Sequence, residues 1–252
     1  MPLTVTADAT QSWIRRFHPA PSAPVRLVCF PHAGGAASFF FPLSQALRDQ
    51  VEVLCVQYPG RHERRREPLI DDIGRLADGI AEALDPCRGE QLAFFGHSMG
   101  AVIAYEVGRR FLGREPGAPL RLFASGRRAP SVYRADMRGE GDEALLADVR
   151  ELDGTDSELL EDEELLRLAL PVLRNDYRAV AAYRCPPGPV LSCPVTVLTG
   201  DSDPKVTEEE AMAWKDHTAG DFEVLTYRGG HFYLTERWQD IASAVRTRLA
   251  GV

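Results

Sequence analysis

Short apolar runs alternate with helical patterns along most of the chain. The apolar runs are bounded by Gly, Pro or polar residues, as is typical of buried strands. These predicted strands are 25–30, 51–56, 92–95, 120–124, 195–198 and 223–225. The segments with helical spacing of apolar residues are 38–47, 70–84, 101–107 and 238–249. Strands that alternate with helices predict an α/β fold, with a mostly parallel sheet covered by helices on both faces.

Residues 141–183 interrupt this alternation. The segment is acidic and leucine-rich, and it lies between two predicted strands that a single crossover helix would connect. Because long insertions in compact domains are usually functional, we expect a helical lid over the active-site edge; a surface excursion without a gating role is the alternative. The length fits a single domain, 1–252, that contains this insertion. We expect an irregular lead-in at 1–24, which Trp13 and Phe17 attach to the body.

Composition excludes several classes of protein. A net charge of −8 argues against general nucleic-acid binding. No apolar run is long enough to cross a membrane, and residues 1–10 lack the pattern of a signal peptide. The five cysteines are an odd number without a Cys-X-X-Cys pair, so we expect reduced thiols in a cytoplasmic protein. His32 and His62 are isolated loop residues in a chain without an evident ligand cluster, so we expect no metal and no organic cofactor.

The sequence Gly96-His97-Ser98-Met99-Gly100 carries the strongest chemical signal. An apolar run precedes it and a helix-compatible run follows, which is the context of a nucleophile elbow in the α/β-hydrolase fold. Ser98 would occupy a strained turn, and the two glycines would let strand and helix approach closely. The alternative is an ordinary strand-to-helix turn with a capping serine. His97 should point away from the Ser98 hydroxyl.

A serine nucleophile needs a base and an orienting carboxylate, which follow it in the order acid, then histidine. Downstream of Ser98 the histidines are His217 and His231. His217 lies in a charged helical stretch and should be solvated, whereas His231 follows the last strand and is the predicted base. Asp201 and Asp203 both lie in the loop after strand 195–198. The loop position before a proline favours Asp203, without excluding Asp201.

An oxyanion hole needs two backbone donors. The amide of Met99, directly after the nucleophile, is one candidate. The second should come from the loop after the first strand, residues 30–36, whose glycines allow a tight turn. Ala33 is the predicted second donor. An ordinary strand-to-helix turn is the alternative.

Arginines cluster after two predicted strands, although the protein is acidic overall. These arginines are Arg61, Arg64, Arg65, Arg66, Arg127 and Arg128. Since carboxyl ends of parallel strands share one sheet edge, the cluster predicts a basic rim for a phosphate or an acidic partner. A solvated loop, paired with Glu63 and Glu67, is an equally weighted alternative.

Seven segments together resemble the type II thioesterases, the editing hydrolases of polyketide and nonribosomal peptide assembly lines. They are FPHAGG (30–35), YPGR (58–61), GHSMG (96–100), SGRRAP (125–130), LRNDY (173–177), GDSD (200–203) and GHFYL (230–234). The resemblance implies a triad of Ser98, Asp203 and His231, with oxyanion donors at Ala33 and Met99. Asn175 and His62 depart from the residues that are common in the family, and neither belongs to this triad.

The resemblance also implies the substrate and partner. The expected substrate is an acyl thioester on the phosphopantetheine arm of an acyl or peptidyl carrier protein, hydrolysed through an acyl-serine by a monomeric enzyme. Aberrant or stalled acyl units would be removed in this way. A small-molecule carboxylesterase or lipase with the same triad is the alternative enzyme. A non-catalytic ligand-binding protein is the alternative from another class, and an intact triad argues against it.

Overall fold

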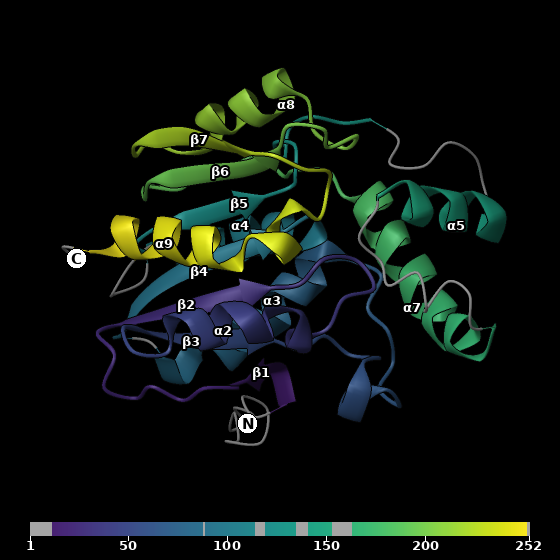
Figure 1. Cartoon of the computed structure of the whole chain (residues 1–252), viewed down its shortest axis with the longest axis horizontal. Helices are drawn as coiled ribbons and strands as arrows, with labels where there is room; N and C mark the ends of the chain where they lie inside the picture. Colours follow the sequence, from purple (N-terminus) through teal and green to yellow (C-terminus); the bar gives the residue numbers. More distant parts are fainter. Residues whose placement is uncertain (1–11, 88, 114–118, 135–140, 153–162, 251–252) are drawn as a thin grey trace.

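The computed structural model describes residues 12–87, 89–113, 119–134, 141–152 and 163–250. Within these ranges the strands form one seven-stranded sheet, in the order β1-β3-β2-β4-β5-β6-β7 (Figure 1). The strands are β1 Ile14–Arg15, β2 Val25–Phe30, β3 Val51–Val56, β4 Gln91–His97, β5 Leu122–Ser125, β6 Val195–Gly200 and β7 Phe222–Tyr227. The helices are α2 Phe41–Leu47, α3 Ile73–Ala83, α4 Met99–Phe111, α5 Gly141–Glu151, α7 Glu163–Ala182, α8 Glu208–Met212 and α9 Trp238–Leu249. The sheet is parallel from β3 to β7, which confirms the expected α/β-hydrolase class of fold.

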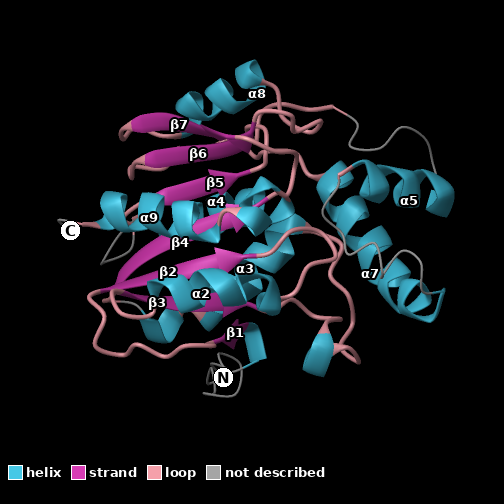
Figure 2. Ribbon diagram, in the orientation of Figure 1, coloured by secondary structure: helices cyan, strands magenta, loops and turns pink. Residues whose placement is uncertain are grey.

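Helices cover both faces of the sheet, α2 and α9 on one and α3 and α4 on the other (Figure 2). Successive side chains of a strand point to opposite faces, so β2 contributes to both layers. Val28 and Phe30 pack with the α3 and α4 residues, whereas Leu27 and Cys29 pack with those of α2 and α9. Burial on both faces explains why the strands read as continuous apolar runs.

The lead-in contains a strand that the sequence pattern does not predict. Ile14 and Arg15 form β1, which pairs antiparallel with the end of β3. A strand of two residues is too short to give a periodic pattern of apolar positions. The expected attachment is confirmed, because Phe17 contacts the Phe41 ring at 5.4 Å between ring centroids and the Arg64 guanidinium lies 4.2 Å from the centre of the Trp13 ring.

Helices α5 and α7 form the insertion between β5 and β6, and they lie beyond the carboxyl ends of the strands (Figure 1). They pack on each other through Leu145, Val149 and Leu173. Part of the expected segment, residues 153–162, lies outside the described residues. In the part of the chain that is described, no helix is long and apolar enough to cross a membrane.

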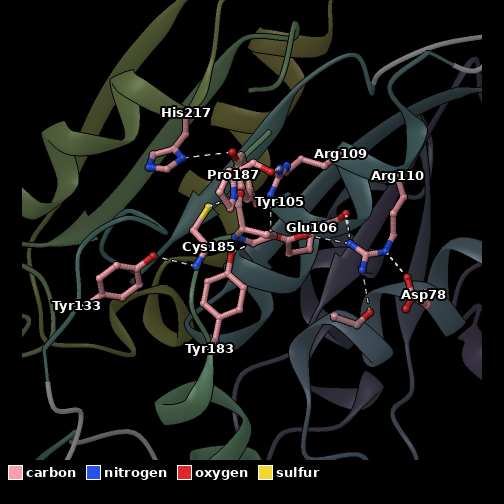
Figure 3. Close-up of polar contacts among 12 residues, drawn as sticks. Asp78, Tyr105, Glu106, Arg109, Arg110, Tyr133, Tyr183, Cys185, Pro187 and His217 are labelled. Carbon is pink, nitrogen blue, oxygen red and sulfur yellow. Dashed lines mark hydrogen bonds and ion pairs between the residues drawn. The ribbon is translucent and has the colours of Figure 1, made fainter. Parts of the chain in front are cut away.

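The end of α7 is anchored to the body through α4. Just beyond the helix, the Tyr183 hydroxyl donates to Glu106 Oε1 at 2.8 Å, and Arg110 Nη1 donates to Glu106 Oε2 at 2.9 Å (Figure 3). Arg110 Nε also donates to Asp78 Oδ1 on α3, at 2.6 Å. The insertion is therefore tied to both helices on one face of the sheet.

Candidate active site

Ser98 lies at the sharp turn between β4 and α4. Its φ of 54° and ψ of −118° place a non-glycine residue in a strained conformation. A Cβ at Gly96 would lie 2.2 Å from the Gly100 carbonyl oxygen, and one at Gly100 would lie 1.9 Å from the Phe30 carbonyl oxygen. Both positions therefore require glycine. This close packing brings the start of α4 against the end of β2, as expected for an elbow.

His231 and Asp203 form a buried pair at the ends of neighbouring strands. His231 Nδ1 lies 3.0 Å from Asp203 Oδ1 and 2.9 Å from Oδ2, and the two residues are 2% and 8% exposed. An ionised carboxylate only accepts hydrogen bonds, so Nδ1 carries the proton. The other ring nitrogen, Nε2, is left as an acceptor, which is the tautomer that a general base requires.

Asp201 lies in the same loop as Asp203 but makes different contacts. Its side chain is exposed, and its Oδ1 accepts a hydrogen bond from the Gly229 amide at 2.9 Å. That bond joins the loop after β6 to the loop after β7. Of the two aspartates, the structure brings Asp203 against His231, and Asp201 has the contacts of a loop-closing residue.

Ser98 and His231 line one small cavity of about 30 Å³ at the carboxyl edge of the sheet. The residues from the sheet side are Ala33, Ser98, Met99, Arg127, Lys205 and His231. The residues from the insertion are Leu152, Tyr177 and Val180. Both predicted oxyanion donors thus lie beside Ser98, and the insertion covers the pocket. Met99 is the first residue of α4, where helical amides lack partners within the helix.

Lys205 lines the Ser98 pocket and pairs with Asp148, a contact that the sequence pattern does not reveal. The Lys205 amide donates to Asp203 Oδ1 at 2.8 Å, and its ammonium contacts the Asp148 carboxylate. The Tyr177 hydroxyl donates to Asp148 Oδ2 at 2.9 Å. Asp148 belongs to α5, so this contact joins the insertion to the loop of Asp203. Neither residue lies in a motif, and only the fold brings them together.

His97 lies beside His231, with 5.1 Å between the ring centroids. Its Nδ1 is 2.9 Å from Ser125 Oγ, which in turn is 2.8 Å from the Tyr233 hydroxyl. The ring therefore turns toward β5. Burial, reinforced by the neighbouring His231 and His32, lowers the pKa of His97 well below its usual value.

We expect this neutral histidine to make the stability of the protein pH-dependent. An unfolded histidine has a pKa of about 6.5, so below that value the unfolded chain binds a proton that folded His97 excludes. Stability is consequently lost as the pH falls. From pH 6.5 to 5.5, the free energy of unfolding in urea should fall by about 1 kcal/mol more in the wild type than in His97→Gln. Equal losses in the two proteins would contradict this origin.

His217 is buried, so the expectation that it is solvated is wrong. It is 6% exposed, and its Nε2 lies 2.8 Å from Ser131 Oγ. Its Nδ1 lies 3.2 Å from the Tyr105 hydroxyl (Figure 3). Its ring packs against Trp214. The charged neighbours in the sequence face solvent while His217 faces the core, a difference that charge content alone does not reveal.

The predicted basic rim is wrong for three of its six arginines. Arg61, Arg64 and Arg128 are 6%, 5% and 2% exposed. Arg64 Nη1 donates to the Gln57 carbonyl at 2.7 Å, and Arg128 Nη2 donates to the Arg134 carbonyl at 2.9 Å. A buried charge is costly unless it is hydrogen-bonded. These guanidiniums donate to backbone carbonyls and so link segments of the loops.

The other three arginines remain accessible. Arg65 and Arg66 are exposed, and Arg127 is half-buried at the Ser98 pocket.

In the described residues, His, Cys, Asp and Glu side chains form no group of three that could hold a metal ion.

The parallel sheet, the strained serine between β4 and α4, and the buried Asp–His pair define an α/β-hydrolase. Comparison with known proteins narrows this class. Residues 25–249 match the family model of the thioesterase domain. The chain belongs to the thioesterase family, and it is a thioester hydrolase.

Named relatives and solved structures agree with this assignment. The chain is 48% identical to a probable cadicidin biosynthesis thioesterase of Streptomyces griseus, over 99% of this chain and 68% of that protein. It is also 48% identical to the thioesterase PikA5 of Streptomyces venezuelae, over 94% and 85%. Among solved structures, the type II thioesterase BorB from the borrelidin biosynthetic cluster superposes with a TM-score of 0.85 at 46% identity, covering 94% of this chain and 98% of that one.

Proposed function

We propose that this protein is a type II thioesterase that removes acyl groups from the phosphopantetheine arm of an acyl or peptidyl carrier protein. In this role it clears aberrant or stalled acyl units from a polyketide or nonribosomal peptide assembly line. The observation that carries the proposal is Ser98 at a strained elbow, sharing one pocket with the Asp203–His231 pair. The 48% identity to a probable cadicidin biosynthesis thioesterase and the 46% identity to BorB, from the borrelidin biosynthetic cluster, support the substrate class.

In the proposed acylation step, Ser98 Oγ attacks the thioester carbonyl carbon while His231 Nε2 removes the hydroxyl proton. The Asp203 carboxylate accepts the hydrogen bond from Nδ1 and stabilises the resulting imidazolium. The carbonyl oxygen becomes an oxyanion, to which the amides of Ala33 and Met99 donate. Both residues line the Ser98 pocket.

The tetrahedral intermediate then collapses with departure of the pantetheine thiol. A thiol has a pKa of about 8.5, so its thiolate leaves more easily than an alkoxide and needs little protonation. The proton held by His231 passes to the departing sulfur. Water, activated by the same histidine, attacks the acyl-Ser98 ester and releases the free acid. Every step uses side chains and amides of this chain.

The insertion of α5 and α7 serves as the lid in this proposal. It supplies Leu152, Tyr177 and Val180 to the Ser98 pocket, which is small in this closed arrangement. A larger cavity of about 430 Å³ adjoins it and shares the residues Arg127 and Val180. Outward movement of the insertion would join the two spaces, and the arm would then reach Ser98 past Arg127.

The exposed pair Arg65 and Arg66 provides a test of carrier recognition. Carrier-bound acyl groups should be hydrolysed with higher kcat/KM than the same acyl group on a short free thiol. Substitution of both arginines by serine should lower kcat/KM for the carrier substrate by roughly three- to tenfold, because exposed ion pairs contribute up to about 1 kcal/mol each. The effect should fade with added salt, which screens exposed charges beyond about 8–10 Å.

The free thioester supplies the internal control, since it lacks the protein partner. As a charge-matched control, Arg48→Ser with Lys215→Ser removes two exposed cations that precede β3 and β7, at the opposite edge of the sheet. Parallel responses of the two substrates would show that Arg65 and Arg66 are merely solvated. Equal rates on both substrates in the wild type would contradict the carrier protein as partner.

A further inference from the structure

A buried carboxylate on the insertion contacts the loop that carries Ala33. Asp176, on α7, is 1% exposed. Its Oδ2 accepts a hydrogen bond from the Gly34 amide at 2.8 Å, and the same oxygen contacts Arg61 Nη2. Asp176 thus joins three segments that are far apart in sequence. Neither it nor Arg61 touches the Ser98 pocket, so the chemistry described above leaves both unexplained.

Arg61 is the cationic partner of Asp176 in this contact. Its Nη1 donates to the Pro59 carbonyl at 2.7 Å, and its Nε donates to the Gly35 carbonyl at 3.3 Å. All three of its nitrogens are therefore engaged, and the side chain is 6% exposed. A guanidinium so placed fixes the direction of two carbonyl groups at once, because its donors are rigidly coplanar.

The backbone on both sides of Ala33 is fixed by these bonds. Before Ala33, the Tyr58 hydroxyl donates to the Pro31 carbonyl at 3.1 Å. After it, the Gly34 amide is bound by Asp176 and the Gly35 carbonyl by Arg61. The peptide that carries the Ala33 amide has the His32 carbonyl, which accepts from the Gly35 amide at 3.0 Å. Side chains from the loop after β3 and from the insertion therefore brace this turn on both sides of Ala33.

The insertion also packs directly on this backbone. Gly34 has a φ of +79°, and a Cβ there would lie 2.5 Å from Leu173 Cδ2 of α7. Asn175, beside Asp176, donates from Nδ2 to the Ile70 carbonyl at 2.8 Å and to Asp176 Oδ1 at 3.3 Å. Both oxygens of the Asp176 carboxylate are thus hydrogen-bonded, and α7 is fixed relative to the loop that carries Ala33.

We propose that Asp176 and Arg61 are positioning residues for the oxyanion hole, so that Ala33 is aligned only when the insertion is in place. The inference rests on the proposed role of Ala33. An oxyanion donor acts within about 2.7–3.1 Å of the developing charge, so a small rotation of the amide is enough to weaken it. Closure of the insertion over a substrate would therefore complete the catalytic geometry.

A buried ion pair can also be purely structural, so the test must separate the two roles. Removal of one partner leaves an unpaired buried charge and can destabilise the fold, whereas replacement of both by neutral groups is often tolerated. We therefore choose the single variant Asp176→Asn and the double variant Arg61→Met with Asp176→Asn. Both are measured with a short free acyl thioester, which avoids any effect on carrier docking.

The proposal predicts a split between kcat and KM. The kcat of the double variant should fall by about ten- to a hundredfold, because the oxyanion forms only during reaction, while KM stays within about twofold. Asp176→Asn should lose less, since an asparagine oxygen can still accept from the Gly34 amide but no longer pairs with the Arg61 charge. Labelling of Ser98 by a fluorophosphonate, which also places an oxygen in the oxyanion hole, should slow in parallel. Binding of a non-hydrolysable thioether analogue should be unchanged. Thermal unfolding of each variant identifies loss of folded protein.

The matched control is Arg178→Gln. Arg178 also joins α7 to the body, through a 3.5 Å ion pair with Asp71, but this pair is exposed and away from the Ala33 loop. Its kcat should be that of the wild type. Unchanged kcat in the folded double variant, or an equal loss in Arg178→Gln, would overturn the positioning role. A wild type that hydrolyses no thioester would instead refute the proposed function, so the two failures are distinguishable.

Discussion

Ser98→Ala is expected to abolish measurable thioester hydrolysis, with kcat reduced by about 10⁴-fold or more. The reason is that Ser98 supplies the atom that forms the acyl-enzyme bond, and a methyl group cannot replace it. Residual activity would come from binding and the oxyanion donors alone. The measurement is steady-state hydrolysis of an acyl-carrier substrate, together with mass spectrometry to detect the acyl-enzyme.

The fold should survive this substitution. Alanine at position 98 meets the same backbone strain as serine, since φ is 54° in either case. Ser202→Ala is the matched control, because Ser202 is exposed and lies in the loop between Asp201 and Asp203. It should keep wild-type activity. An alanine variant at position 98 that retains most of its activity, or that still forms an acyl-enzyme, would contradict the mechanism.

The central strands could be predicted almost to the residue. The bounds of β2 and β3 are as expected, 25–30 and 51–56, because burial on both faces requires continuous apolar runs. The two-residue strand β1 could not be predicted, because its pairing depends on β3 rather than on its own pattern. Helix α8 was also missed; its five residues are defined by a capping box at Thr207 rather than by apolar spacing.

Burial of polar side chains was the least predictable property. A run of four arginines within six residues suggests a surface, yet Arg61 and Arg64 are buried while Arg65 and Arg66 are exposed. The partners of Arg61 are a carboxylate 115 positions away and backbone carbonyls. Charge composition contains no information about such partners. For the same reason His217 was placed on the surface, although its ring is bound by Tyr105 and Ser131.

The candidate catalytic residues were easier to predict, because each follows a strand end. Chain order after Ser98 leaves few histidines, and the loop after β7 places His231 over the sheet edge. The choice between Asp201 and Asp203 was harder. Both follow β6 in one loop, and the sequence contains only a proline as a guide. The structure separates them by contacts, and substitution can test which one orients the base.

Asp203→Asn should lower kcat by about 10³- to 10⁴-fold, whereas Asp201→Asn should change it by less than about tenfold. Asp203 accepts from His231 Nδ1 at 2.9–3.0 Å. An amide in its place can donate a hydrogen bond to Nδ1, which would put the proton on Nε2 and remove the base from Ser98. Asp201 instead accepts from the Gly229 amide, and the oxygen of asparagine can still do so.

The two variants form a matched pair, because the same chemical change is made two positions apart in one loop. Hydrolysis of a carrier-bound acyl group gives kcat and KM for each, and circular dichroism checks that both remain folded. The loss in Asp203→Asn should be in kcat, since the imidazolium that Asp203 stabilises exists only during the reaction. Equal losses in both variants, or a larger loss in Asp201→Asn, would mean that the contact between Asp203 and His231 does not orient the catalytic base.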